Sequence, residues 1–257
     1  MIASYTQTYG DERLELFRFK AYDQPDASFR SRLASNVLAF HGSSAGFRRA
    51  VEEADFVRKV GFSILEYPGA LPYPRTLERS LRRLRDDGVR HVLFLQDDVF
   101  SVAGQASFEA LHAYATAGDF ELLSVELTPQ EVDVAGCGRV FETDELTVYA
   151  ASSEDYRRSG VWAMDDGPFL ARIDFLLDRL YDERYFSMPD VWSAEAYLKE
   201  KIEQDPVPRF LTDVRFYWRA NLLGRNADRR RGYRFLQARF PDAAPEVQRS
   251  LSRLARS

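Results

Sequence analysis

The sequence contains only one cysteine, Cys137, among 257 residues. A single cysteine excludes an intramolecular disulfide and a metal cluster held by several thiolates of one chain. This scarcity is typical of proteins of a reducing compartment, so a cytoplasmic location is expected. Long apolar runs are missing too: no segment approaches the roughly 18 apolar residues of a membrane span, and residues 1–17 lack the basic start and apolar core of a signal peptide. We therefore expect a soluble protein without a transmembrane segment.

The sequence also lacks a large excess of charge of either sign. Its formal net charge is −5, and the charged residues, 29% of the chain, are not gathered in long blocks. This balance argues against a surface that binds nucleic acid over its whole extent, although it leaves room for a local basic patch. Hydrophobic residues make up 45% of the chain, which is enough to bury the core of one large domain.

Apolar runs followed by polar loops alternate with amphipathic segments in the first half of the chain. We predict strands at residues 1–6, 36–41, 62–69, 89–95 and 120–128, and helices at 45–60, 74–88 and 106–119. The second half is less regular, with predicted strands at 139–151 and 208–218 and helices at 168–181 and 193–204. Repeated strand, loop and helix indicates an α/β fold with a mixed, mostly parallel sheet flanked by helices.

Two adjacent carboxylates, Asp97 and Asp98, follow the apolar run 89–95 after one residue, Gln96. Ligands of parallel sheets collect at the carboxyl ends of the strands, and buried acids need a cation or hydrogen-bond donors to compensate them. Mg²⁺ and Mn²⁺ prefer oxygen ligands and are often held by one or two carboxylates together with substrate phosphates. The alternative is that the acids cap a helix beginning near Ser101 or Ala106. The residues alone leave both interpretations open.

The order of these elements, with "SYTQTYG" after the first strand, "FHGSS" after the second and "LFLQDD" after the fourth, resembles the GT-A fold of nucleotide-sugar glycosyltransferases. Residues 96–98, "QDD", look like a variant of the D-x-D motif of that family. The resemblance implies a divalent ion, Mn²⁺ or Mg²⁺, bound by Asp98. It also implies that Asp97 assists donor binding, through either the metal or the ribose, and that Gln96 faces the ribose and sugar.

The second half carries a further resemblance. "FSMPDVWSAEAYLKEKI", residues 186–202, is similar to the E-D motif of the family, in which an acid is the general base of the inverting members. Because Pro189 stands where the family has Glu, Asp190 is the first choice for the base and Glu195 the second. Asp190 or Ser193 also fits a simple helix N-cap, and the residues do not decide between these roles.

The resemblance and the strand-end rule together place a nucleotide pocket at the ends of the first three strands. Its predicted members are Tyr5, Thr6, Arg13, His41, Ser43 and Arg75. Arg219, with its neighbours Tyr217 and Trp218 in "YWRAN", is expected to close over a diphosphate or sugar, and packing of Trp218 alone is the alternative. Some of these residues have plainer alternatives. Tyr5 suits the core, Arg75 suits a solvated helix face, and His41 suits a histidine satisfied by its own protein.

The predicted organisation is a GT-A-like domain at residues 1–222, with a nucleotide-binding half at 1–127 and an acceptor-side half at 128–222. An Arg-rich helical extension at 223–257 is either a binding site for an anionic partner or a solvated face.

The predicted function is metal-dependent transfer of a sugar, with inversion, from a nucleoside diphosphate sugar to a hydroxyl acceptor: a glycan, protein, small molecule or nucleic acid. Two alternatives remain. A nucleotidyltransferase shares the fold type but normally has a Gly-rich basic loop after its first strand, which "SYTQTYGDER" lacks. The other is a non-catalytic module that binds nucleotides or sugars.

Overall fold

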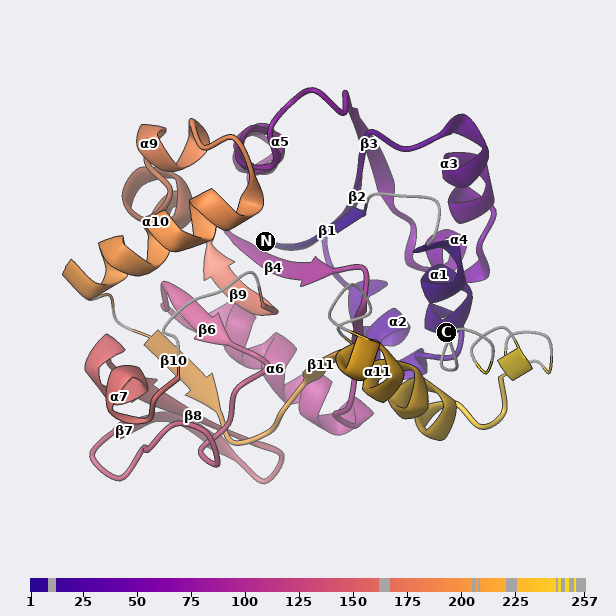
Figure 1. The fold of residues 1–257 in the computed structure, drawn as a ribbon. Helices are drawn as coiled ribbons and strands as arrows, with labels where there is room; N and C mark the ends of the chain where they lie inside the picture. The colour runs from indigo at the N-terminus through magenta and orange to yellow at the C-terminus, as the bar shows by residue number, and fades with distance from the viewer. Residues whose placement is uncertain are drawn as a thin grey trace.

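The computed structural model describes residues 1–8, 13–161, 167–204, 207, 209–220, 226–243, 245, 248, 249 and 252. These residues form a nine-stranded sheet in the order β3-β2-β1-β4-β9-β6-β10-β8-β7, and a two-stranded sheet of β5 and β11 (Figure 1). The strands are β1 Ile2–Thr8, β2 Ser35–His41, β3 Ser63–Tyr67, β4 His91–Gln96, β5 Val99–Ser101, β6 Leu122–Ser124, β7 Gly138–Thr143, β8 Leu146–Ala151, β9 Phe169–Arg172, β10 Arg209–Thr212 and β11 Tyr217–Arg219. The predicted mixed α/β fold is confirmed.

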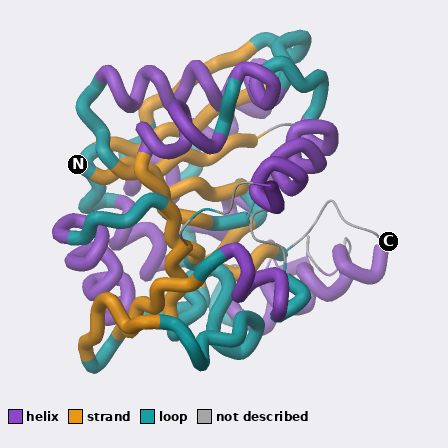
Figure 2. The backbone as a smooth tube through the Cα atoms, turned by 90° about the vertical axis from the view of Figure 1, so that its left-hand side faces the viewer, coloured by secondary structure: helices purple, strands orange, loops and turns teal. Residues whose placement is uncertain are grey.

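Helices cover both faces of the large sheet, and Figure 2 shows the strands as a layer between them. They are α1 Leu14–Lys20, α2 Gln24–Arg30, α3 Ala45–Glu52, α4 Asp55–Val60, α5 Tyr73–Asp86, α6 Gln105–Ala117, α7 Ser153–Arg158, α8 Ile173–Phe175, the π-helix η2 Leu176–Leu180, α9 Glu183–Phe186, α10 Val191–Gln204 and α11 Asn226–Arg239. Among the described residues, no helix has the length and apolar character needed to cross a bilayer.

Strand direction defines two edges of the sheet. β1 pairs in parallel with β2 and β4, and β2 pairs in parallel with β3. β9 lies antiparallel between β4 and β6. The four parallel strands β1 to β4 therefore end at a common carboxyl edge, at Thr8, His41, Tyr67 and Gln96.

Separate clusters of apolar side chains hold the two helical layers to the sheet. Alternate residues of the strands, such as Ala3, Val37 and Val92, pack under α5 and α8 to α10. The opposite face of the strands contributes residues such as Leu38 and Leu93 to the clusters under α1 to α4 and α6. This alternation is what the two-residue period of a strand covered on both faces dictates.

Four predicted elements differ from the observed ones. The strand predicted at residues 208–218 is instead two short strands, β10 in the large sheet and β11 in the small sheet. Residues 45–60 form two helices instead of one, because Val51 of α3 and Phe56 of α4 reach the same apolar cluster only if the chain turns at the extended residue Ala54. Residues 168–181 begin as β9, since their first residues pair with β4 and β6, and become helical only from Ile173. Residues 139–151 form the hairpin β7–β8 instead of one strand.

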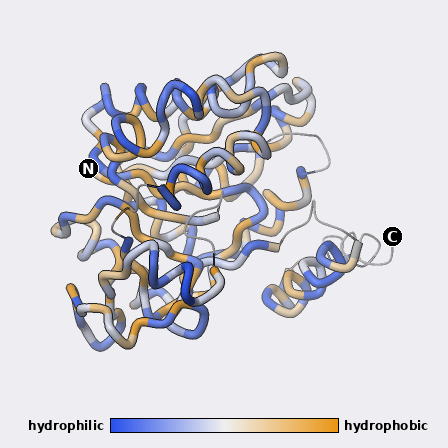
Figure 3. The backbone as a smooth tube through the Cα atoms, turned by 60° about the vertical axis from the view of Figure 1, so that its left-hand side comes forward, coloured by the Kyte–Doolittle hydropathy of each residue, from blue (hydrophilic) through white to orange (hydrophobic). Residues whose placement is uncertain are grey.

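The predicted C-terminal helix is present as α11. Its apolar residues, among them Tyr233, Leu236 and Phe240, pack in one cluster with Leu16 and Phe19 of α1. On its exposed side α11 carries arginines at 230, 231 and 234. Figure 3 shows the resulting mixture of hydrophilic and hydrophobic residues along this helix.

Candidate active site

Asp97 and Asp98 form a turn between β4 and β5, which we call the acid turn. Both residues are buried, at 0% and 4% exposure. The next helix, α6, begins only at Gln105 with Gly104 as its N-cap. The acids therefore do not cap a helix, and the alternative interpretation of this pair loses its basis.

Asp97 is held in place through both of its carboxylate oxygens. Thr8, the last residue of β1, donates its Oγ1 hydroxyl to Asp97 Oδ2 at 2.6 Å. Arg13, which is also buried, forms an ion pair with Asp97 Oδ1. Burial nevertheless raises the pKa of Asp97 to about 6, against the lowering effect of Arg13. Arg13, predicted as a nucleotide contact, is thus one of the groups that position the acid turn.

The other side of the acid turn is held by the two-stranded sheet. The Ala220 amide donates to the Asp98 carbonyl oxygen at 2.9 Å, and β11 runs antiparallel to β5 from that point. Arg219 pairs in register with Val99 and so lies beside the turn. Gln96 pairs with Gln7 of β1 at the same edge. The structure therefore brings Gln96, Asp97, Asp98 and Arg219 together at this edge.

Below the acid turn lies a group of buried charged residues that the sequence interpretation missed. Asp23 accepts a hydrogen bond from the Ser101 amide at 2.8 Å, and Lys20 donates one to the Val99 carbonyl oxygen. These two bonds attach α1 and the residues after it to β5. Burial raises the pKa of Asp23 to about 6, and burial lowers the pKa of Lys20.

Asp26 and Arg30 of α2 continue this group. Asp26 Oδ1 accepts from Arg30 Nε at 3.1 Å and from the Tyr217 hydroxyl at 2.8 Å. Arg30 also donates to Thr6 Oγ1 at 2.9 Å. Charges in short helices normally suggest a solvated surface, so only their spacing relative to the apolar residues Phe17, Phe19 and Phe29 could have indicated burial.

Tyr5 and Thr6 face the interior instead of the rim. The Tyr5 ring is fully buried and stacks on Phe94, with ring centroids 5.6 Å apart, and its hydroxyl donates to Gln7. Thr6 is 1% exposed and engaged by Arg30. Their packing supports the core alternative, and a base stacked on Tyr5 has no access to the ring.

The loops that follow β2 and β3 lie against each other. Gly42 adopts φ +65°, and a Cβ there would come 3.0 Å from the Gly69 Cα, so the close approach depends on glycine. The His41 Nε2–H donates to the Leu71 carbonyl oxygen. The Ser43 hydroxyl oxygen is buried and has no hydrogen-bond partner among the described residues. Ser43 is thus a donor at the rim that a bound ligand can satisfy.

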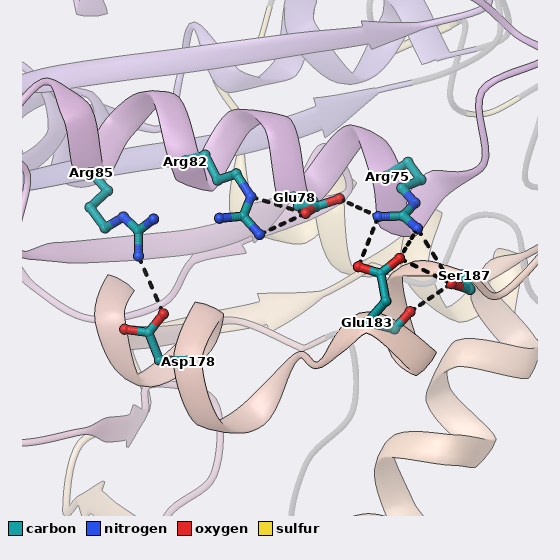
Figure 4. Close-up of polar contacts among 7 residues, drawn as sticks. All are labelled: Arg75, Glu78, Arg82, Arg85, Asp178, Glu183 and Ser187. Carbon is teal, nitrogen blue, oxygen red and sulfur yellow. Dashed lines mark hydrogen bonds and ion pairs between the residues drawn. The ribbon is translucent and has the colours of Figure 1, made fainter.

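Arg75 is occupied by its own protein. It donates to Glu78 at 2.7 Å and forms an ion pair with Glu183 of α9. Figure 4 shows this contact as one end of a row in which Arg82 and Arg85 of α5 also meet acids. The hydrogen bonds to Glu183 and Glu78 raise the pKa of Arg75 further. This arrangement supports a role in joining α5 to α9, not a nucleotide contact.

Asp190 stands immediately before α10. Its Oδ1 accepts from the Ser193 amide at 2.8 Å and its Oδ2 from the Ser193 hydroxyl at 3.0 Å, and these bonds lower the pKa of Asp190. Asp190 therefore caps α10 while remaining exposed. Glu195, one turn further along α10, is half-buried. Because Arg75 at the start of α5 also contacts Ser187, the beginning of α10 lies toward the carboxyl edge of the sheet.

The donor set suits an oxygen-preferring ion only in part. Among the described residues, no group of three or more His, Cys, Asp or Glu side chains is arranged to hold a metal ion. Asp97 is committed to Arg13 and Thr8, so Asp98 is the carboxylate of the acid turn that fits a metal ligand. One carboxylate is sufficient where substrate phosphates supply further oxygens. Asp165 and Asp166 lie outside the described residues.

No protein-family model and no curated relative matches the sequence. Solved structures do match its fold. The chain superposes on TarS of S. aureus with a TM-score of 0.53 at 11% identity. The match covers 98% of this chain and 42% of the TarS chain. A structure of TarS residues 1–349 in complex with UDP-GlcNAc matches with a TM-score of 0.51 at 10% identity, and the match covers 99% of this chain and 70% of that one. The chain has the GT-A fold.

A mannosyltransferase of Pyrobaculum calidifontis, PcManGT, in complex with GDP-Man and Mn²⁺, gives a TM-score of 0.50 at 12% identity. It covers 98% of this chain and 68% of that one. The present chain thus spans less than half of the full TarS chain and about two thirds of PcManGT. Within the GT-A fold, the acid turn follows the fourth parallel strand at the edge where such sheets bind ligands.

Proposed function

We propose that the protein is a glycosyltransferase that moves a sugar from a nucleoside diphosphate sugar to a hydroxyl acceptor. The observation that carries this proposal is the acid turn, in which Asp97 is fixed from both sides and Asp98 follows it at the end of a central parallel strand. Two solved structures of the same fold contain a nucleotide sugar, UDP-GlcNAc in one and GDP-Man in the other.

In this proposal Asp98 binds a divalent ion, Mn²⁺ or Mg²⁺, through which the donor diphosphate is held. When bound, such an ion neutralises the charge that develops on the leaving diphosphate. Asp97 keeps the turn in position through Thr8 and Arg13. Arg219, beside Val99, adds a permanent positive charge next to the diphosphate, and Gln96 faces the ribose and sugar.

The nucleoside occupies the rim formed by the loops after β2 and β3. Ser43 supplies a buried hydroxyl without a partner among the described residues, and His41 fixes the neighbouring loop through Leu71. A buried hydroxyl that gains a hydrogen bond from a ligand recovers the cost of its burial. The base specificity of the donor therefore depends on these two short loops.

Asp190 or Glu195 takes the proton of the acceptor hydroxyl. Asp190 is ionised and exposed at the start of α10, as a base must be before the acceptor arrives. Its contacts with Ser193 orient the carboxylate, but they also lower its basicity. Glu195 is the second candidate, because it lies one turn later on the same helix. In this proposal the activated hydroxyl attacks directly, opposite the leaving diphosphate, and the sugar carbon is inverted.

Calorimetric titration with UDP and GDP, with and without Mn²⁺, tests donor binding, and hydrolysis of a panel of nucleotide sugars tests the reaction without an acceptor. We expect binding of at least one nucleoside diphosphate that Mn²⁺ strengthens, and slow release of sugar from the matching donor. A nucleotidyltransferase would instead release pyrophosphate from a nucleoside triphosphate in the presence of a sugar phosphate. No binding of UDP or GDP in Mn²⁺, together with no release of sugar from any donor of the panel, would reject the proposal.

A further inference from the structure

A cavity lies at the amino edge of the sheet, opposite the acid turn. It has a volume of about 300 Å³ and is bounded by the starts of β1 and β4, the end of α2 and the last turns of α6. Ile2, Leu33 and Ala115 give it an apolar floor. Figure 1 shows the N-terminus beside the start of β4, where the Met1 carbonyl oxygen accepts from the Arg90 and His91 amides. This volume suits a small ligand.

Cationic side chains stand at the mouth of this cavity. Arg32 and Arg90 line it together with His112. Arg32 has an acid partner, Glu109, at 3.6 Å, and Arg90 has Asp119 at 2.8 Å. These side chains are between 40% and 76% exposed, and ion pairs in such positions are weak and exchange readily with water or with another anion. Both arginines are therefore available to an anionic ligand.

His91 adds a feature that surface charges alone do not provide. It lines the cavity at 2% exposure, and its Nε2 has no hydrogen-bond partner among the described residues. The ring stacks on Phe120 and hydrogen-bonds the Phe120 backbone. Because that bond favours the protonated ring, it is made by Nδ1–H to the carbonyl oxygen, which leaves Nε2 as an acceptor.

Burial lowers the pKa of His91 to about 4, so the ring is neutral near pH 7 and its acceptor role is fixed. A buried acceptor without a donor is costly and uncommon in folded proteins. A ligand hydroxyl would supply the missing donor, while its anionic group would lie near the two arginines.

We propose that the amino-edge cavity is a binding site for a small oxyanion that also carries a hydroxyl group, a phosphate monoester or a carboxylate. The arginines Arg32 and Arg90 bind the anionic group, and His91 Nε2 accepts the hydroxyl. The site is separate from the acid turn, because β4 begins at the cavity and ends at the turn.

The chain contains three histidines, which makes the test direct. His91 and His112 line the cavity, whereas His41 ends β2 at the opposite edge and reports on the nucleotide rim. We would follow the three imidazole C–H signals by NMR during titration with glycerol 3-phosphate, glycerate, methyl phosphate and glycerol. We expect saturable shifts of His91 and His112, with His41 unchanged, for glycerol 3-phosphate or glycerate. Methyl phosphate should bind more weakly and glycerol not at all.

Variants separate the two recognition elements. Arg32→Gln with Arg90→Gln should weaken glycerol 3-phosphate binding by about tenfold or more. The matched control is Arg58→Gln with Arg139→Gln, which removes two exposed, ion-paired arginines outside the cavity and should change nothing. His91→Phe keeps a ring on Phe120 and should abolish the preference for glycerol 3-phosphate over methyl phosphate. No saturable shift, shifts confined to His41, or equal loss in both double variants would overturn the proposal, even if His91→Phe fails to fold.

Discussion

Arg13 and Asp97 form a buried ion pair that joins the segment after β1 to the segment after β4, 84 residues later in the chain. The Asp97 carboxylate is bound by the Arg13 guanidinium and the Thr8 hydroxyl, so it has little capacity left to bind a metal ion. Asp97 therefore holds the turn, and the proposed binding role falls to Asp98.

Exchanging each acid for its amide should separate these tasks. Asp97→Asn leaves the buried Arg13 without its counter-charge, and breaking a buried pair in this way costs about 3 to 5 kcal/mol. Asp98→Asn should instead remove the increase in nucleotide affinity that Mn²⁺ produces. Urea unfolding and calorimetric titration of both variants provide the check. If Asp97→Asn kept full stability while Asp98→Asn kept manganese-dependent binding, the assignment of both roles would be wrong.

Thr8 offers a finer test of the same arrangement. Thr8→Val keeps the shape of the side chain but removes the donor to Asp97, and losing a hydrogen bond to a charged, buried group costs about 1.5 to 3 kcal/mol. Thr8→Ser keeps the donor and serves as the control. The free energy of unfolding should fall clearly for the valine variant and much less for the serine variant. Equal losses would point to the methyl group instead of the hydrogen bond.

The raised pKa of Asp23 predicts a specific pH dependence. Because burial raises that pKa to about 6, the folded protein keeps a proton on Asp23 that the unfolded chain releases near pH 4. The contribution of Asp23 to stability is therefore fully present below about pH 4 and is lost as the pH rises to about 6. Relative to Asp23→Asn, the wild-type protein should lose stability across this range and then level off. Urea unfolding at pH 4, 5, 6 and 7 measures this difference, and a rise with pH would contradict it.

Asp190→Asn distinguishes a base from a cap. Asparagine caps helices about as well as aspartate, so the variant should keep its melting temperature. If Asp190 is the base, turnover should fall on the order of 10²- to 10⁴-fold with donor affinity retained. Glu195→Gln is the parallel variant, and Asp190→Ala removes both functions at once. Normal transfer by Asp190→Asn together with slow transfer by Glu195→Gln would assign the base to Glu195.

Arg75→Gln should leave nucleotide affinity unchanged, because the guanidinium is engaged by Glu78 and Glu183. Its exposed ion pairs are worth little individually, so the melting temperature should drop only slightly. Arg219→Gln, beside the acid turn, is the comparison and should weaken nucleoside diphosphate binding. A large loss of affinity in Arg75→Gln would return this residue to the nucleotide pocket.

The sequence predicted the position of the acid turn because the rule behind it is local. An apolar run of strand length followed by two acids places those acids at a strand end, and the parallel order of the first strands places that end at the ligand edge. The same reasoning predicted most elements of the first half. β9 was missed because the run from Phe169 has no periodicity that separates a buried strand from a buried helix, and pairing with β4 decided it.

The supports of the turn were not predictable in the same way. Arg13 meets Asp97 only when β1 and β4 are neighbours, and Asp23 meets Ser101 only when the α1–α2 segment folds beneath β5. Such pairs depend on long-range contacts, and charged residues in short helices look solvated from sequence alone. Tyr5 shows the opposite case: its place near a strand end suggested the rim, but β1 is buried on both faces.

The backbone bond between Ala220 and Asp98 also sets an order of events as the chain is synthesised. The parallel strands β1 to β4 are complete before half of the chain has been made, but β5 finds its partner β11 only after about 120 further residues. Closing so long a segment is slow, since loop entropy must be overcome before the contact forms. A nascent chain that ends before β11 is therefore expected to lack the backbone bond that holds Asp98 in the acid turn.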